Sequence, residues 1–436
     1  MEQGSAKRDD IIGLKRDARA PLNQGARASV AVPSRGVLEQ GSAKRDDIIG
    51  FKRDARAPLN RRAGITVPPT LIITNDFPPR VGGIESFVSD VCALLDHDVV
   101  VYAPGTSGAA ASDRDRPFPV IRNGPLLIPT PRLAARTVEL LGEFGMTRVI
   151  FGAAAPLGLL APVLRRAGAR HIVGLTHGHE TWWARVPAAR QLLHRIGESC
   201  DHLTTISGYT ERLIASALSP SACGRLLRLA PPVDLGRFRP PEAVAARSAG
   251  RCIAVARLIR RKGMATLLRA WRAVIDRAAS SGARRELVLV GDGPQRPRLE
   301  RSIHELELSD HVRLMGALPR AAVIGQLQRA NVFALPVRTL LAGLNPEGLG
   351  LAALEAAACG LPVIVGHSGG APETVRDGDT GFVVPSDDHE FLAERLSLLL
   401  DNPALALQMG TRGRRYVSAH FSMESARTRL RAALDL

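Results

Sequence analysis

Two glutamates eight residues apart carry the clearest sign of chemistry in this sequence. Glu347 and Glu355 stand in the string NPEGLGLAALEAAACGLPVI, in which the Gly-Leu-Gly of residues 348–350 opens a helix directly after an apolar run. Free amides at a helix start bind phosphate, and glycine lets the phosphate approach closely. A carboxylate accepts hydrogen bonds from two sugar hydroxyls at once. The pattern predicts a diphosphate at Gly348, Leu349 and Gly350, with a sugar at each glutamate. A solvated helix face would explain Glu355 alone.

A basic string earlier in the chain supplies positive charge. In ARLIRRKG, Arg257 ends an apolar run and Lys262 precedes a glycine and a new helix. An arginine fork and a lysine point charge there can neutralise a departing diphosphate as its bond to a sugar breaks. A basic loop alone is usually just solvated. Together with the Glu347 string, it favours binding of an anionic substrate.

The first half of the chain has two further polar strings. NDFPPRVGGIES places Gly82 and Gly83 between a strand-like run and a helix, where the backbone can approach a phosphate or sugar. A plain tight turn is the alternative for this string. THGHE places His177, His179 and Glu180 after another run, which indicates contact with a polar substrate. We exclude zinc because no third or fourth ligand clusters nearby in sequence. Three Asp-x-Asp strings are interpreted as turns: Asp96–Asp98, Asp113–Asp115 and Asp377–Asp379.

Short apolar runs separated by amphipathic helices must position these residues. The runs lack the alternation of a half-exposed sheet, which is typical of buried parallel strands. They fall in two series: 71–76, 99–104, 149–154, 171–177 and 203–207, then 252–257, 286–293, 311–316, 332–337, 362–366 and 381–385. A proline-rich stretch separates the series. We therefore expect two doubly wound α/β domains, 68–236 and 237–419, facing a cleft between the carboxyl ends of their strands. We expect the helix 420–436 to join the first domain.

The N-terminal extension, residues 1–67, contains a duplication. The 22 residues 2–23 recur as 39–60 with a single change, from Leu14 to Phe51. Two copies are too few for a solenoid core, so we predict disorder. The extension is either a basic membrane tether or a duplicated leader with no catalytic role.

Composition narrows the class of partner. The chain has 436 residues, 45% of them hydrophobic, and a formal net charge of +16, which suits lipid headgroups, sugar nucleotides or nucleic acid. With 4% aromatic residues it lacks a stacking platform for nucleic acid. An arginine-rich composition bias would give the same charge. No apolar run is long enough to span a bilayer, the start lacks a secretory signal, and five scattered cysteines fit a reduced, cytoplasmic protein.

Taken together, these strings resemble one enzyme family. TNDFPPRVGGIES, THGHE, TISGYT, ARLIRRKG, LVLVGDGP, EGLGLAALEAAACGLPVI and SGGAPETVRDGDTGFVV are similar to the motifs of glycosyltransferase family 4, which has the GT-B fold. Within it, residues 70–430 most resemble the actinobacterial GDP-mannose-dependent phosphatidylinositol mannosyltransferases, and among these the enzyme that adds the second mannose to phosphatidylinositol monomannoside. The linker APPVD and the apolar loop TLLAGLNP depart from the family pattern, and the loop leaves the acceptor open.

The resemblance implies a retaining transfer of mannose from GDP-mannose to a membrane lipid, phosphatidylinositol monomannoside, giving an α-linked product without a metal or another cofactor. It places Arg257 and Lys262 on the diphosphate, Glu347 on the hexose and Glu355 on the ribose, with His179 and Gly83 near the reacting sugar. Retention by same-face attack and retention through a covalent intermediate both stay open. The sequence indicates no oligomeric state.

Other functions remain as alternatives. A related enzyme with a UDP-sugar donor or a soluble acceptor would share these strings. A phosphorylase would need a Schiff-base lysine, but Lys262 is the only lysine beyond residue 52. A catalytically silent, membrane-associated scaffold is the rival from another class.

We expect the protein to work as a peripheral protein at the inner face of the plasma membrane, on an anionic surface. In that interpretation Trp182 and Trp183 lie at headgroup level while Arg185 and Arg190 meet anionic lipid. The alternative is that both tryptophans pack in the core.

Overall fold

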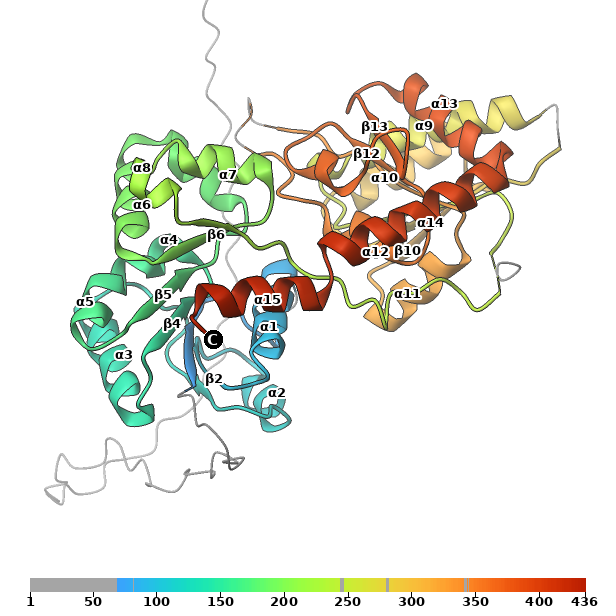
Figure 1. The fold of residues 1–436 in the computed structure, drawn as a ribbon. Helices are drawn as coiled ribbons and strands as arrows, with labels where there is room; N and C mark the ends of the chain where they lie inside the picture. The colour runs from blue at the N-terminus through green and yellow to red at the C-terminus, as the bar shows by residue number, and fades with distance from the viewer. Residues whose placement is uncertain (1–68, 81, 244–246, 280–281, 341–342, 344) are drawn as a thin grey trace, which may run out of the picture. The chain divides into compact units, whose positions relative to one another are not determined.

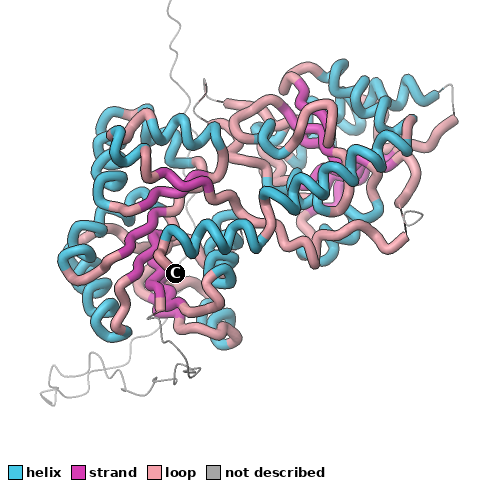
Figure 2. Tube along the Cα trace, viewed as in Figure 1, coloured by secondary structure: helices cyan, strands magenta, loops and turns pink. Residues whose placement is uncertain are grey.

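The computed structural model describes residues 69–436, except 81, 244–246, 280–281, 341–342 and 344 (Figure 1). The duplicated extension, for which the sequence predicts disorder, lies outside the described residues. The described part contains two parallel sheets, each covered by helices (Figure 2). The prediction of two doubly wound domains is confirmed.

The first domain is built on a seven-stranded sheet with the strand order β3-β2-β1-β4-β5-β6-β7. Its strands are β1 Thr70–Ile73, β2 Val99–Ala103, β3 Val120–Arg122, β4 Arg148–Phe151, β5 His171–Gly174, β6 His202–Thr205 and β7 Leu226–Arg228. Its helices are α1 Gly83–Leu94, α2 Ala109–Arg114, α3 Pro131–Phe144, α4 Ala154–Leu157, η1 Gly158–Leu160, α5 Ala161–Arg166, η2 His179–Arg185, α6 Pro187–Ser199, α7 Gly208–Ala215 and α8 Pro220–Cys223.

The second domain is built on a six-stranded sheet with the order β10-β9-β8-β11-β12-β13. Its strands are β8 Arg251–Val255, β9 Glu286–Val290, β10 Val312–Gly316, β11 Val332–Leu335, β12 Val363–Gly366 and β13 Gly381–Val384. Its helices are η4 Arg260–Lys262, α9 Met264–Ala278, α10 Arg296–Glu305, α11 Arg320–Arg329, α12 Leu351–Ala358, η6 Ala371–Thr374, α13 His389–Asp401 and α14 Pro403–His420.

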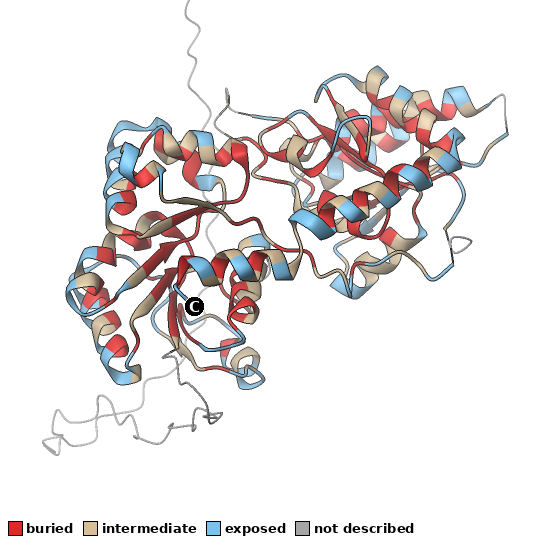
Figure 3. Ribbon diagram, viewed as in Figure 1, coloured by how far each residue is buried: buried red, intermediate tan, exposed pale blue. Residues whose placement is uncertain are grey.

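The apolar runs form the buried centre of each sheet. Every residue of β1, β2, β11 and β12 is buried, while the helices that flank the sheets expose one face (Figure 3). The sequence patterns missed β3 and β7, which are the edge strands of the first sheet and are only half-buried. An edge strand needs no continuous apolar run, because one of its sides faces solvent.

The last helix, α15 Met423–Ala433, belongs to the first domain. Its Ala426 and Leu430 share a hydrophobic core with Phe87 and Val88 of α1 (Figure 1). The chain therefore crosses between the domains twice, and the crossings pair where the Val233 amide donates to the Phe421 carbonyl at 2.7 Å.

The five cysteines are free thiols, all buried except the half-buried Cys223. Among the described helices, none is both long and apolar enough to cross a bilayer.

Candidate active site

A lysine and a glutamate meet where two neighbouring strands of the second sheet end. After β8 the chain forms the short 3₁₀ helix η4, which ends at Gly263 with a φ of +70°. A Cβ at Gly263 would lie 1.9 Å from the Pro336 carbonyl oxygen, so only glycine fits this turn. The turn aims Lys262 at the loop after β11, and its Nζ lies 2.8 Å from Oε2 of Glu347.

The backbone of Glu347 is held by the segment that follows β12. The Glu347 carbonyl accepts from the Gly370 amide at 2.9 Å, and the Glu347 amide donates to Oγ of Ser368 at 3.4 Å. Gly369 has a φ of +58°, and a Cβ there would lie 1.9 Å from the Glu347 carbonyl oxygen. Only 7% of Glu347 is exposed. The buried carboxylate is thus fixed in place beside its lysine.

The helix start that the sequence predicts for phosphate begins at Gly350. Gly350 is the N-cap of α12 with a φ of +106°, and no side chain caps the helix. The first amides of α12 are therefore not used by a capping side chain. The preceding Leu349 is buried, and Gly348 packs against Ile206 and the His177 carbonyl of the first domain.

Glu355 lies in the second turn of α12 and is almost buried. Arg320 of α11 donates to its Oε1 at 3.1 Å. Burial raises the pKa of Glu355 to about 7, and Arg320 opposes the rise. Asp90 of α1, in the other domain, adds to the rise, and burial likewise raises the pKa of Asp90 to about 6. One arginine therefore serves two carboxyl groups that come from opposite domains.

The structure leaves two of the predicted residues without side-chain contacts to this cluster. Arg257 follows β8 and is exposed, and no side-chain hydrogen bond or ion pair involves it within the described residues. Gly83 is exposed at the start of α1, with no atom within 4 Å of a Cβ placed there. The close approach occurs at Gly82 instead, where a Cβ would lie 2.2 Å from Oε2 of Glu85.

The THGHE string forms a histidine–carboxylate arrangement after β5. Glu180 is fully buried; its Oε2 accepts from the His177 amide at 2.9 Å, and its Oε1 lies 3.4 Å from Nε2 of the exposed His179. That Oε1 has no hydrogen-bond partner in the described part of the chain. His177 is turned inward to the Gly152 carbonyl, and burial lowers its pKa. Only His179 is thus presented to a substrate.

The His179 loop and the Glu347 loop touch each other. A Cβ at Gly178 would lie 3.2 Å from the Gly348 Cα, and Oγ of Ser207 donates to the Gly348 carbonyl at 2.8 Å. The structure therefore brings His179, Lys262, Glu347 and the start of α12 to one junction.

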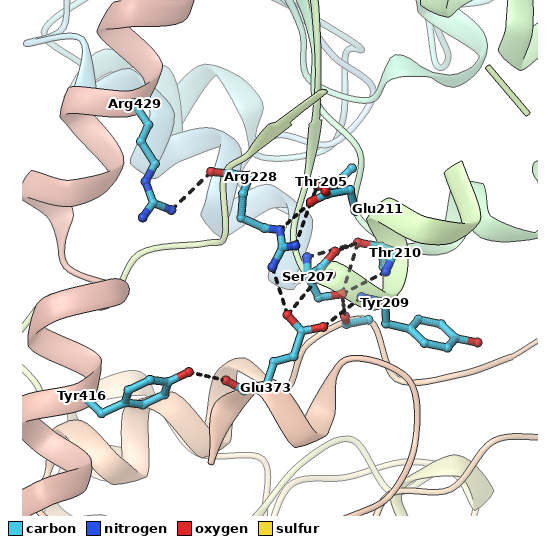
Figure 4. A network of polar contacts seen from close by, with 11 residues as sticks. Thr205, Ser207, Tyr209, Thr210, Glu211, Arg228, Glu373, Tyr416 and Arg429 are labelled. Atoms are coloured by element: carbon cyan, nitrogen blue, oxygen red, sulfur yellow. Dashed lines mark hydrogen bonds and ion pairs between the residues drawn. The ribbon is translucent and has the colours of Figure 1, made fainter. Parts of the chain in front are cut away.

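A second polar cluster at this junction was not predicted from the sequence. The carboxylate of Glu373, in η6, accepts from the amides of Gly208 and Tyr209 at the start of α7 and pairs with Arg228 of β7 (Figure 4). The capping string Ser207–Thr210 is visible in the sequence, but its partner 165 residues later is not. A cavity of about 680 Å³ lies beside the cluster. It is lined by Gly208, Tyr209, Arg212, Arg228, Thr339, His367, Gly369, Pro372 and Glu373.

The Asp-x-Asp strings have structural partners. Asp96 pairs with Arg427, Asp113 with Arg122 and Asp379 with Arg412. In the ranges that the structure describes, no three histidine, cysteine, aspartate or glutamate side chains gather as metal ligands would.

Of the two tryptophans considered for the membrane surface, one packs in the core and the other is exposed. Trp183 packs against the core of the first domain, whereas Trp182 is 42% exposed. Arg185 donates to the Gly343 carbonyl at 2.6 Å, and Arg190 donates to the carbonyls of Ala184 and Ser216.

Two family models match the chain. The model described as Glycosyltransferase Family 4 matches residues 81–237, and the model described as Glycosyl transferases group 1 matches residues 248–416.

Two curated relatives match along nearly their whole length. The GDP-mannose-dependent alpha-(1-6)-phosphatidylinositol monomannoside mannosyltransferase of Mycolicibacterium smegmatis is 41% identical over 377 residues, which cover 83% of this chain and 96% of the relative. A Corynebacterium glutamicum enzyme, whose name adds that its lipid is monoacylated, is 41% identical over 380 residues with the same coverage.

Solved structures share the fold. HepE of Anabaena, in complex with UDP and glucose, aligns with a TM-score of 0.69 at 15% identity, over 84% of this chain and 99% of that one. Sucrose-phosphate synthase of Thermosynechococcus elongatus aligns with a TM-score of 0.66 at 22% identity, over 83% and 97%. The GT-B prediction is confirmed.

Proposed function

This chain belongs to the family 4 glycosyltransferases, and from that membership we propose that it transfers mannose from GDP-mannose to a phosphatidylinositol mannoside lipid with retention of configuration. The observation that carries the proposal is the 41% identity, over 96% of their length, to relatives named as GDP-mannose-dependent phosphatidylinositol monomannoside mannosyltransferases. The paired Lys262 and Glu347 at the start of α12 supply a site with matching chemistry.

The diphosphate would bind at the second domain. Lys262 and Arg257 bring two positive charges to the loops after β8, and the free amides of α12 add the positive end of a helix dipole. Charge grows on the diphosphate as the sugar bond breaks, and these groups would stabilise that charge. We propose that no metal ion is required. Transfer that survives excess EDTA supports this, and transfer that stops until Mg²⁺ returns opposes it.

The carboxylates would bind the sugars. Glu347, held by Lys262, can accept hydrogen bonds from two mannose hydroxyls, and Glu355 can do the same for the ribose once it is ionised. His179 stands on the first-domain side of the junction, and its Nε2 lies 3.4 Å from Oε1 of Glu180.

Retention would follow from attack on the face that the diphosphate leaves. The acceptor oxygen bonds to the anomeric carbon, the bond to phosphate breaks, and the acceptor proton passes to the departing phosphate oxygen. A covalent intermediate on a carboxylate is the other route. Mass spectrometry of protein quenched during turnover with a slow fluorinated donor decides between them, since only the second route leaves a hexose on the chain.

We propose that the first domain docks on the inner face of the plasma membrane. Leu126 and Ile128, in the loop after β3, are 56% and 55% exposed, and Trp182 is exposed after β5. Parallel strands end at the same edge of their sheet, so these side chains share the edge that carries His179. Arg80, Arg185 and Arg190 each donate to a backbone carbonyl. We take Arg80 as the candidate for lipid phosphate because its side chain is 51% exposed and it follows β1 at the same edge of the sheet.

Flotation with liposomes tests the membrane proposal. Binding to vesicles with anionic lipid, reduced in Trp182→Ala and unchanged in Leu407→Ala, is the expected result, because Leu407 is equally exposed but lies on α14 of the second domain. Equal flotation of both variants would remove the docking surface from the proposal.

Calorimetry with GDP and UDP tests the donor. We expect tighter binding of GDP. Tighter binding of UDP would replace mannose by another sugar, and binding of GDP without turnover of GDP-mannose would favour a silent scaffold.

A further inference from the structure

Glu373 joins the two domains at the start of α7. Its Oε2 accepts from the Gly208 amide at 2.7 Å, and its Oε1 accepts from the Tyr209 amide at 2.8 Å (Figure 4). These amides lie at the positive end of the α7 dipole and have no partner within the helix. A carboxylate from the second domain thus binds a helix start of the first.

Arg228 reinforces this contact from the side. Its Nη1 lies 3.0 Å from the Glu373 carboxylate, and its Nη2 lies 2.7 Å from that of Glu211, within the first domain. The Tyr416 hydroxyl donates to the Glu373 carbonyl at 2.9 Å and anchors η6 to α14 of its own domain. We call the contacts of Glu373 with Gly208, Tyr209 and Arg228 the clasp.

The clasp is connected to the Glu347 loop through short backbone steps. Gly370, three residues before Glu373, donates its amide to the Glu347 carbonyl at 2.9 Å. A Cβ at Gly370 would lie 2.6 Å from Oγ of Ser207, the residue that caps α7 and donates to the Gly348 carbonyl. While Glu373 holds the start of α7, the Glu347–Gly348 segment is therefore in contact with the first domain.

We infer that Glu373 is a positioning residue: it latches α7 to the second domain and so brings His179 to the Glu347 loop for transfer. The inference rests on the proposed function, because it assigns a role in that same site. In the described part of the chain, no hydrogen bond or ion pair joins the Glu373 side chain to Lys262 or to the first turn of α12, so the clasp acts on the contact between the domains.

The test compares two glutamates that share one arginine. Glu373→Ala removes the bond between the domains, whereas Glu211→Gln removes an ion pair of Arg228 that stays within the first domain. Since Glu373 is about a third exposed, we expect kcat for Glu373→Ala to fall about tenfold. We expect the Kd for GDP to stay within about twofold, because the donor groups are all in the second domain. Glu373→Gln, which keeps one acceptor oxygen, should lose less.

Small-angle X-ray scattering measures how compact the protein is. The response of this compactness to GDP would not change if Glu373 only stabilised the fold. The wild type and Glu211→Gln should become more compact when GDP is added, and Glu373→Ala should not, at unchanged melting temperature. Equal loss of kcat in Glu211→Gln, or full compaction and full kcat in Glu373→Ala, overturns the inference. If Glu373→Ala melts early, Arg228→Met must show the same loss of compaction at normal stability, or the inference fails. If the wild type compacts with GDP but does not turn over GDP-mannose, the proposed function fails while the scattering still decides the clasp.

Discussion

The ammonium of Lys262 lies 2.8 Å from the carboxylate of Glu347, so the positive group expected on the diphosphate is already engaged by the acid expected on the sugar. The pair links the loops after β8 and β11, and Arg261 stands 3.9 Å from the same carboxylate oxygen. A diphosphate that enters this site must compete with Glu347 for the lysine. Removal of each partner should therefore change GDP binding in a different way.

We expect Lys262→Met to weaken GDP binding about tenfold, because a charge-assisted hydrogen bond to the diphosphate is lost. Glu347→Gln should bind GDP as tightly as the wild type or more tightly, because its lysine is released. Both variants should lose about a hundredfold or more in kcat. Calorimetry and steady-state kinetics measure the two effects. Equal weakening of GDP binding in both variants would contradict the competition.

Donor binding should depend on pH through Glu355. Burial raises its pKa to about 7, so the carboxyl is mostly protonated at pH 6 and mostly ionised at pH 8. The ionised form accepts two ribose hydroxyls, so GDP-mannose should bind up to about tenfold more tightly at pH 8 than at pH 6. The diphosphate diester of GDP-mannose does not titrate in this range. The control is calorimetry of GDP-mannose binding to Glu355→Gln at both pH values. If binding to this variant depends on pH as it does in the wild type, Glu355 is not the group responsible.

The same raised pKa has the opposite consequence for the free protein. A carboxyl whose pKa is higher in the folded state than its ordinary 4.5 stabilises the fold at low pH, and this contribution is lost as pH rises through about 7. The melting temperature of Glu355→Gln should therefore gain on that of the wild type between pH 5 and pH 8. A constant difference over that range would argue against a buried ionisation.

Glu180 should matter although it is buried. Its Oε1 lies 3.4 Å from Nε2 of His179 and has no hydrogen-bond partner among the described residues, so Glu180→Gln replaces the carboxylate beside this histidine by a neutral amide. We expect kcat to fall about tenfold and GDP binding to stay unchanged, since the donor groups lie in the other domain. Glu198→Gln, an exposed site in the same domain, serves as the control. Unchanged kcat in Glu180→Gln would make Glu180 a packing residue.

Much of the fold was readable because buried parallel strands leave continuous apolar runs. β1, β2, β11 and β12 are such runs, whereas the half-buried edge strands β3 and β7 leave none. The position of Lys262 and Glu347 at one edge of the second sheet could be predicted. Each residue follows a buried strand, and neighbouring parallel strands end at the same edge. The clasp could not be predicted: Glu373 and Gly208 stand in two of the strings that carry the resemblance, but nothing in the sequence shows that residues 165 positions apart are in contact. For the same reason the sequence could not show that Arg185 binds the Gly343 carbonyl of the other domain.

Gly369 and Gly378 distinguish the cost of a strained backbone from the cost of a steric clash. Gly369 and Gly378 both have positive φ, +58° and +74°, but a Cβ at Gly369 would lie 1.9 Å from the Glu347 carbonyl oxygen while Gly378 has open space. Gly378→Ala should cost about 1–2 kcal/mol of unfolding free energy. Gly369→Ala should cost clearly more and should also reduce kcat, because it displaces Glu347. Urea unfolding measures the free energy of unfolding of both variants. Equal losses would show that the Glu347 loop shifts to accommodate the added Cβ without cost.

The central claim is tested by the product itself. The full chain is incubated with GDP-mannose and phosphatidylinositol monomannoside in detergent micelles, with UDP-glucose in a parallel reaction, and the lipid is analysed by mass spectrometry and proton NMR. We predict that GDP-mannose adds one hexose with an α-anomeric signal and that Glu347→Gln adds none. A β-anomeric signal, or a lipid that stays unmodified by GDP-mannose while UDP-glucose is consumed, would contradict retaining mannosyl transfer.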